Sequence, residues 1–271
     1  MFKKSHILFV LIVVCFLFAC AGTALAAETT GLDLNNQENG SISYGLDASA
    51  TGEFKLMLQK QGGTKYYYDL KQGHKESFAL QFGNGEYTVT LLQKISGTQY
   101  RVLKAQKVTL ELEDNKKVFL NSVQNVKWQD TDQAIIKAQA LTANLKTDSE
   151  KIAAIYNYVI NNVKYDQAKA NTVKSGYLPN INTTYSTNKG ICYDYASLFG
   201  AMLRSVGIPT KLVMGTSTYT KDTYHAWNEV YSSTENQWLT IDTTVDATLK
   251  SAANTYQMKK DVTRYTVDKI Y

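Results

Sequence analysis

A chain of 271 residues is long enough for one large domain or two smaller ones, and its 44% hydrophobic content can supply a sizeable core. The formal charge is only +5 and is spread along the chain, which excludes the dense basic patch of a nucleic-acid-binding protein. A weak positive charge is compatible with an anionic surface such as a cell wall, but ordinary solubility explains it equally well.

The first 26 residues have the pattern of a secretory signal peptide. Lys3 and Lys4 form a positive segment, and the apolar run 7–19 that follows is too short to favour a membrane span. Small residues at Ala24 and Ala26 then provide a cleavage site. We therefore expect cleavage after Ala26, a mature chain without a transmembrane span, and a secreted or cell-surface location.

Two other interpretations of this segment rank lower. A lipoprotein signal with lipid on Cys20 is second, because Phe18 is bulky for that motif, and an uncleaved anchor is third. Cys15 and Cys20 both lie in the signal region, so Cys192 is the only cysteine expected in the mature chain. An unpaired cysteine in a secreted protein indicates a reactive thiol or an intermolecular disulfide, and we rank the disulfide lower.

The region after the signal peptide predicts an all-β domain. Residues 27–39 are polar and predict a flexible leader, and 40–122 shows short alternating runs separated by turn signals, which are typical of strands. The runs lie at 54–58, 66–70, 78–82, 87–91, 100–103 and 108–112. Their spacing favours a β-sandwich, and Gly85–Val89 resembles a strand of immunoglobulin-like modules. We expect an immunoglobulin-like β-sandwich over 40–122.

The hydrophobic period changes from two to 3.6 near Val123, where we place the start of a second domain, 123–271. One helix is predicted over 134–141, and the capping-box pattern Thr147–Glu150 opens a second. The polar stretch 166–189 predicts a long loop. Because this loop leads directly to a cysteine, we expect it to form the rim or lid of a site.

The segment 189–209 predicts a buried helix that begins with a thiol. Apolar residues recur at helical spacing from Cys192 to Val206, and Gly207 and Pro209 supply the stop signals. The free N–H groups and the positive end of the helix dipole favour a thiolate at this position. The alternative is that Cys192 is a small buried hydrophobe, as most free cysteines are.

Two predicted strands carry the partners that a catalytic thiol needs. Strands are expected over 210–217, 224–231 and 237–243. His225 lies in the second and can take the thiol proton and return it to a leaving group near neutral pH. Asp242 lies in the third and can fix the tautomer of the imidazole. Because side chains alternate along a strand, Asp242 can face a polar site while its neighbours face the core.

Other polar residues have simpler interpretations. Asp194 complements the helix dipole as a first-turn acid rather than acting as a catalyst. A metal site made of Cys192 and His225 lacks two more obvious ligands. We therefore expect neither a metal nor another cofactor.

Three motifs resemble those of the transglutaminase-like superfamily and occur in the same order. They are the cysteine motif Gly190–Ala196, the histidine motif Tyr224–Tyr231 and the aspartate motif Trp238–Asp242. Ser175–Pro179 is also similar to a segment of secreted bacterial members. The resemblance extends from about Val123 to the C-terminus and implies a papain-like α+β core, with the cysteine helix packed on an antiparallel sheet.

The resemblance also implies a chemistry and its residues. A Cys192–His225–Asp242 triad would form an acyl-enzyme from a peptide or isopeptide amide and pass the acyl group to an amine or to water. The implied substrate is a protein or peptide. The implied location of this substrate is the cell surface or the cell wall. Members of the superfamily include protein cross-linkers, proteases and amidases, so fold and triad leave the acceptor open.

The sequence departs from the animal cross-linking members at one point. No tryptophan lies between Trp128 and Cys192 to steady the oxyanion, so the Cys192 backbone N–H and a side chain such as Tyr185 are expected to serve. The other candidates for the substrate pocket are Tyr193, Tyr224 and Trp227. The sequence offers no acidic cluster to support calcium dependence. The alternative function is a non-catalytic extracellular binding or adhesion protein, which the intact triad disfavours.

Overall fold

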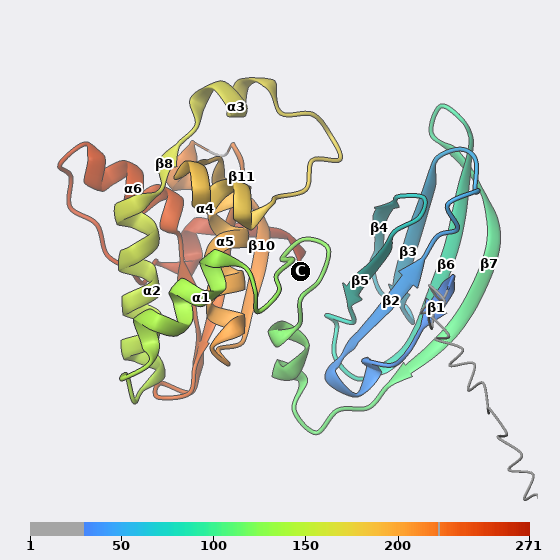
Figure 1. The fold of residues 1–271 in the computed structure, drawn as a ribbon, viewed down its shortest axis with the longest axis horizontal. Coiled ribbons are helices and arrows are strands. Elements are labelled where there is room, and N and C mark those ends of the chain that lie inside the picture. The colour runs from blue at the N-terminus through green and yellow to red at the C-terminus, as the bar shows by residue number, and fades with distance from the viewer. Residues whose placement is uncertain (1–29, 222) are drawn as a thin grey trace, which may run out of the picture.

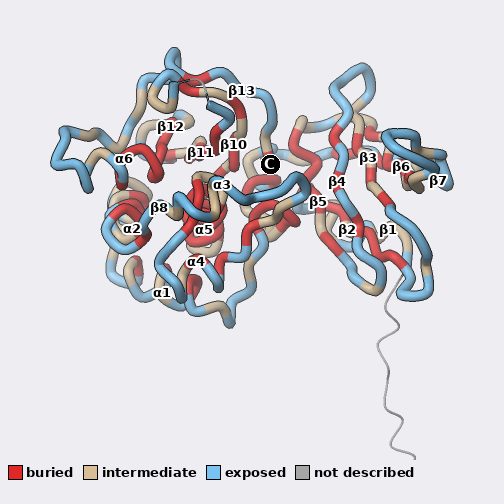
Figure 2. The backbone as a smooth tube through the Cα atoms, turned by 90° about the horizontal axis from the view of Figure 1, so that it is seen from above, coloured by how far each residue is buried: buried red, intermediate tan, exposed pale blue. Residues whose placement is uncertain are grey.

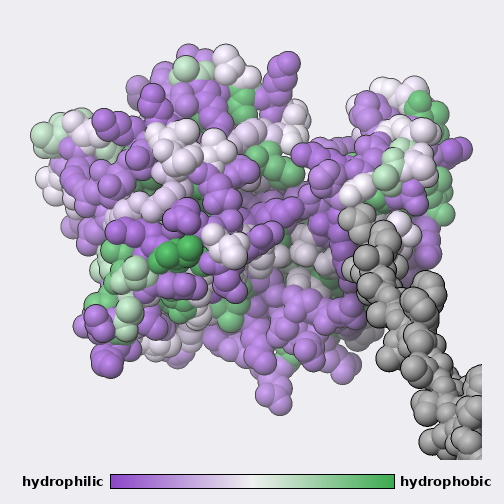
Figure 3. Space-filling model, in the orientation of Figure 1, coloured by the Kyte–Doolittle hydropathy of each residue, from purple (hydrophilic) through white to green (hydrophobic). Residues whose placement is uncertain are grey.

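The computed structural model describes residues 30–221 and 223–271, which form two lobes (Figure 1). The predicted signal peptide, its cleavage site and the alternative lipid site lie outside the described residues. Within these residues, no helix has the length and apolar character needed to cross a membrane. On the face drawn in Figure 3 the surface is mainly hydrophilic, and apolar residues form small patches.

The N-terminal lobe consists of two antiparallel sheets. The strands are β1 (Gly31–Asp33), β2 (Ser41–Gly45), β3 (Phe54–Lys60), β4 (Lys65–Leu70), β5 (Lys75–Ala79), β6 (Gly85–Ser96) and β7 (Gln99–Leu110). One sheet has the order β1-β2-β5 and the other β4-β3-β6-β7. Alternate residues such as Leu56, Leu58 and Val89 are buried, as the two-residue period predicts. The β-rich region is confirmed, whereas its immunoglobulin-like topology stays a prediction.

One detail of the strand prediction is wrong. The run 100–103 and residues 108–110 of the next run belong to one long strand, β7, whose residues pair with β6 along almost its whole length. The polar residues between the two runs face solvent at the edge of the sheet, so they interrupt the hydrophobic pattern without interrupting the strand.

The C-terminal lobe is a mixed α+β unit. Its helices are α1 (Gln133–Thr142), α2 (Asp148–Asn162), α3 (Gln167–Thr172), α4 (Ile181–Thr187), α5 (Cys192–Ser205) and α6 (Thr243–Ser251). Its strands are β8 (Lys164–Tyr165), β9 (Lys189–Gly190), β10 (Thr210–Ser217), β11 (Tyr224–Ser232), β12 (Gln237–Ile241) and β13 (Tyr265–Ile270). The antiparallel sheet has the order β12-β11-β10-β13. The α+β class is therefore confirmed, as is the capping box of α2, in which Thr147 and Glu150 exchange hydrogen bonds.

Helix α5 lies at the centre of this lobe. Every residue from Asp194 to Arg204 is buried, so the helix is enclosed on all sides rather than on the one face that its periodicity predicts (Figure 2). Strands β10 and β11 pack on one side of α5, and helices α1, α2, α4 and α6 also contact it. The Asn228 amide fixes helix to sheet, donating to the carbonyls of Ala196 at 3.0 Å and Lys211 at 3.2 Å.

The two lobes share one continuous hydrophobic core. The Tyr271 ring lies between them, 5.7 Å from the Tyr66 ring and 6.0 Å from the Tyr68 ring, and the C-terminal end is central in Figure 1. The Gln124 side chain also donates to the Asp69 carbonyl at 2.8 Å. The boundary near Val123 stays a prediction, but a fragment starting there would expose part of this shared core.

Arg204 connects the end of α5 to the segment before α1, to strand β10 and to the last residue of the chain. Its guanidinium donates to the carbonyls of Asn121, Thr210 and Tyr271 at 2.7, 2.8 and 2.9 Å. Burial lowers the pKa of Arg204 to about 9. Three carbonyl acceptors compensate for part of the cost of removing this charge from water.

Candidate active site

Cys192 is the first residue of α5, and contacts of its neighbours in the chain fix the start of this helix. The backbone N–H of Ile191 donates to the Asp194 carboxylate at 2.9 Å. Gly190 is required for a steric reason, because a Cβ atom there would lie 2.6 Å from the Cβ of Asp194. The cysteine is only partly buried, which leaves its thiol at the surface of the lobe although most of the helix is enclosed.

Asp194 also anchors the segment that precedes the cysteine. Its fully buried carboxylate accepts hydrogen bonds from Lys169 at 2.7 Å and from the Tyr177 hydroxyl at 2.5 Å. Burial, followed by the charge and hydrogen bond of Asp194, raises the pKa of Tyr177. The first-turn acid therefore serves as a tie between the helix start and the segment 166–180, a role that its position in the helix does not by itself predict.

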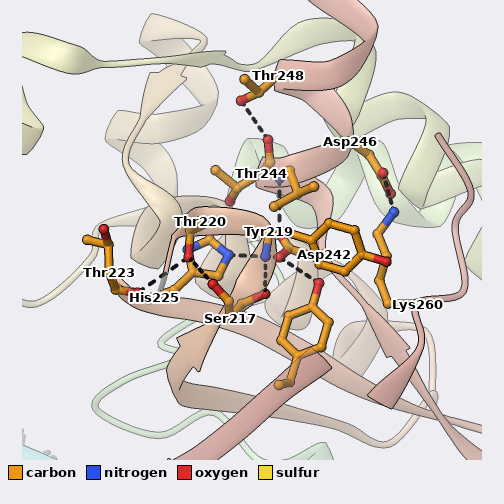
Figure 4. Close-up of polar contacts among 12 residues, drawn as sticks. Ser217, Tyr219, Thr220, Thr223, His225, Asp242, Thr244, Asp246, Thr248 and Lys260 are labelled. Carbon is orange, nitrogen blue, oxygen red and sulfur yellow. Dashed lines mark hydrogen bonds and ion pairs between the residues drawn. The ribbon is translucent and has the colours of Figure 1, made fainter. Parts of the chain in front are cut away.

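His225 and Asp242 form a buried pair at the end of the sheet. The His225 Nε2 and Asp242 Oδ2 atoms are 2.8 Å apart, and the two residues are 5% and 0% exposed (Figure 4). The Tyr265 hydroxyl donates to the same carboxylate oxygen at 3.0 Å, and the Val245 N–H donates to the other, also at 3.0 Å. Both oxygens of Asp242 are therefore held in place.

The structure corrects how Asp242 comes to face the site. The predicted strand 237–243 ends at Ile241, and Asp242 is the N-cap of α6. The carboxylate is oriented by its capping bond to Val245 rather than by strand alternation. The expected loop 166–189 likewise contains two short helices, α3 and α4.

The charges around His225 favour its imidazolium form. Burial lowers its pKa, but the charge and hydrogen bond of Asp242, together with the hydrogen bond and charge of Cys192, outweigh burial and raise the pKa to about 10. Because Nε2 bonds Asp242, Nδ1 is the nitrogen available to the thiol. Asp242 and Cys192 together therefore favour the imidazolium form of His225 at neutral pH.

Cys192 and His225 open onto a groove formed by two adjoining pockets. One pocket, of about 340 Å³, extends towards α6 and is lined there by Val245 and Leu249. The other, of about 660 Å³, extends along the segment 170–177. The pockets share Tyr165, Gln167, Cys192, Thr223, Tyr224 and His225. We call the two pockets together the Cys192 groove, and an extended chain could lie across the thiol in it.

The structure places two of the four predicted pocket residues in the Cys192 groove. Tyr193 and Tyr224 line it, and the Tyr193 hydroxyl accepts a hydrogen bond from Asn125 at 2.7 Å. Trp227 does not line it, because its side chain is 1% exposed and packs on Tyr265, so the structure gives it a core position. Tyr185 is also elsewhere, with its ring stacked on Tyr158 at 6.2 Å, which corrects its expected place near the oxyanion.

Several residues of the site carry no signal in the sequence. Tyr265 reaches Asp242 from β13, and Lys169 reaches Asp194 from α3, each through tertiary packing alone. A second buried acid, Asp246, pairs with Lys260 and accepts from the Tyr156 hydroxyl at 2.8 Å (Figure 4). In the part of the chain described here, no cluster of three or more His, Cys, Asp or Glu is placed to bind a metal. The expectation of no cofactor stays a prediction.

We expect His225 to titrate well above its ordinary pKa of 6.5. The folded protein should keep a proton that the unfolded chain releases, so this histidine stabilises the fold fully below pH 6.5. That contribution should be lost as the pH rises towards about 10. NMR titration of the ring, assigned with a His225→Gln variant, measures the midpoint, and a value at or below 6.5 would contradict the structure.

Comparison with known proteins shows which family part of the C-terminal lobe matches. Residues 136–243 match the transglutaminase-like superfamily. A UPF0252 protein of Methanocaldococcus jannaschii is 35% identical over 123 residues, which are 41% of this chain and 34% of that protein. The human kyphoscoliosis peptidase is 32% identical over 109 residues, 36% of this chain and 16% of that protein. The chain thus spans about a third or less of the length of these relatives.

Among solved structures, a candidate cysteine protease of Cytophaga hutchinsonii is 14% identical, with a TM-score of 0.46 over 85% of this chain and 79% of that one. Red sea bream transglutaminase is 13% identical, with a TM-score of 0.33 over 75% of this chain and 47% of that one.

The C-terminal lobe is therefore an α+β unit with a thiol at the start of its central helix and a buried His–Asp pair beside it. Residues 136–243 belong to the transglutaminase-like superfamily, as the three sequence motifs predict.

Proposed function

We propose that this protein is a cysteine acyltransferase or hydrolase that acts on peptide or isopeptide amides through Cys192, His225 and Asp242. The observation that carries the proposal is the buried His225–Asp242 pair, 2.8 Å apart, whose histidine lines the same groove as the only free thiol among the described residues. A structural cysteine needs neither an imidazole partner nor an open groove. An activated nucleophile needs both.

The proposed reaction has two stages. The Cys192 thiolate attacks the amide carbonyl carbon, and the carbonyl π electrons move to oxygen. The tetrahedral intermediate then collapses, the C–N bond breaks, and the His225 imidazolium gives its proton to the leaving amine. In the second stage the neutral imidazole takes a proton from water or from an acceptor amine, which attacks the thioester and releases Cys192.

Asp242 acts throughout as an orienting group. It holds Nε2 of the ring, so that Nδ1 stays directed to the thiol, and it stabilises the imidazolium between the two stages. Membership of the transglutaminase-like superfamily supports acyl transfer as the class of reaction. The human relative is named a peptidase, which is the hydrolytic form of this chemistry. The groove geometry is compatible with either acceptor.

The acceptor can be determined with one substrate. We expect the protein, incubated with dimethylcasein and dansylcadaverine, either to attach the fluorescent amine to casein or to cut casein into peptides. Fluorescence of the casein band on a gel reports transfer, and mass spectrometry reports hydrolysis. Alkylating Cys192 beforehand with iodoacetamide should abolish both. Activity that persists after complete alkylation would contradict the proposal and leave a binding protein as the better account.

A further inference from the structure

Tyr165 is held beside Cys192 by a short parallel pairing of strands. Strand β8 pairs with β9 so that Tyr165 lies opposite Gly190, two residues before the cysteine. The Asp166 N–H donates to the Gly190 carbonyl at 2.9 Å, and the Lys164 N–H donates to the Asn188 carbonyl at 2.9 Å. These two bonds fix the backbone of Tyr165 against the segment that leads into α5.

The Tyr165 side chain belongs to the central part of the Cys192 groove. It lines both pockets together with Cys192 and His225, and the residue is 41% exposed. Its hydroxyl has no hydrogen-bond partner among the described residues. Burial raises the pKa of Tyr165, and the charge of Cys192 raises it further. The hydroxyl is therefore protonated at neutral pH, and its side chain lines the same groove as Cys192.

Two other long polar side chains that line both pockets already form hydrogen bonds. The Gln167 amide donates to the Asn171 side chain at 2.9 Å. The Tyr224 hydroxyl donates to the Asp268 carboxylate, also at 2.9 Å. The Tyr165 hydroxyl can therefore donate a hydrogen bond to a substrate without first breaking an existing one.

We propose that the Tyr165 hydroxyl, together with the backbone N–H of Cys192, donates a hydrogen bond to the oxyanion of the tetrahedral intermediate. This inference rests on the proposed function and adds a catalytic residue to it. As the C–S bond forms and the carbonyl π electrons move to oxygen, negative charge develops there. The first N–H groups of a helix have no acceptor within the helix, so Cys192 supplies one donor and Tyr165 the second.

Two reactions of the same thiol separate this role from a structural one. Acylation by p-nitrophenyl acetate passes through a tetrahedral oxyanion, whereas alkylation by iodoacetamide is a direct displacement at carbon without one. In Tyr165→Phe, which loses only the hydroxyl, we expect the acylation rate to fall by a factor of about 10². The alkylation rate should stay close to that of the unchanged protein. Release of p-nitrophenol and intact mass measure the two rates.

A matched control removes a tyrosine hydroxyl outside the groove. Tyr158→Phe, on α2, should keep both rates. Normal acylation of Tyr165→Phe would overturn the inference, and so would an equal fall in both rates, which would show that Tyr165 only positions the thiol. If the protein without any substitution is alkylated but never acylated at Cys192, this result would instead contradict the proposed function itself.

Discussion

Replacing Cys192 with alanine should abolish acyl-enzyme formation while the protein stays folded. The side chain is only partly buried, so losing its sulfur removes little packing, but no other thiol among the described residues can replace it as a nucleophile. Cys192→Ser should be nearly as inactive, because a hydroxyl is far less acidic than a thiol. The measurement is turnover of the casein substrate, with the trapped thioester followed by intact mass.

Circular dichroism and the urea midpoint of the Cys192 variants provide the control for folding. A folded Cys192→Ala protein that still turns over casein at the normal rate would exclude the cysteine mechanism. The groove would then be explained by binding alone.

The second large effect is expected at the His225–Asp242 pair. His225→Ala should lower turnover by a factor of about 10² to 10⁴, because it removes both the base and the proton donor. It should also slow alkylation of Cys192 by iodoacetamide at pH 7, because the imidazolium that favours the thiolate is gone. Asp242→Asn should cause a smaller but clear loss, since an amide can still cap α6 but holds the ring less well in its productive tautomer.

Asp246→Asn is the matched control for the aspartate. Asp246 is also fully buried on α6, but its partners are Lys260 and Tyr156 rather than His225. Its replacement should lower the free energy of unfolding without a comparable fall in turnover per folded molecule. If Asp242→Asn and Asp246→Asn lost activity in equal proportion to their stability, Asp242 would have only a structural role.

The local elements were largely predictable because their signals are local. Strand β10 has the predicted bounds, 210–217, and the capping box at Thr147 opens α2. Predictions failed where a polar side chain caps a helix that the sequence pattern did not predict. Asp242 leaves the strand because its carboxylate caps the next helix, and the polar segment 166–189 forms two helices whose Asp166 and Asn180 side chains cap them.

The sequence alone determined which residues are candidates for the proposed chemistry. Cys192 at a helix start is followed by a histidine motif and an aspartate motif, and this order indicated which residues could react, because reactivity depends on residue type and local backbone. Only the tertiary structure decided what surrounds them. Tyr165, Lys169 and Tyr265 reach the site from separate elements, through strand pairing and buried hydrogen bonds between residues distant in the chain. Such contacts have no periodicity or motif, so the donors and anchors of the groove became visible only once the chain was folded.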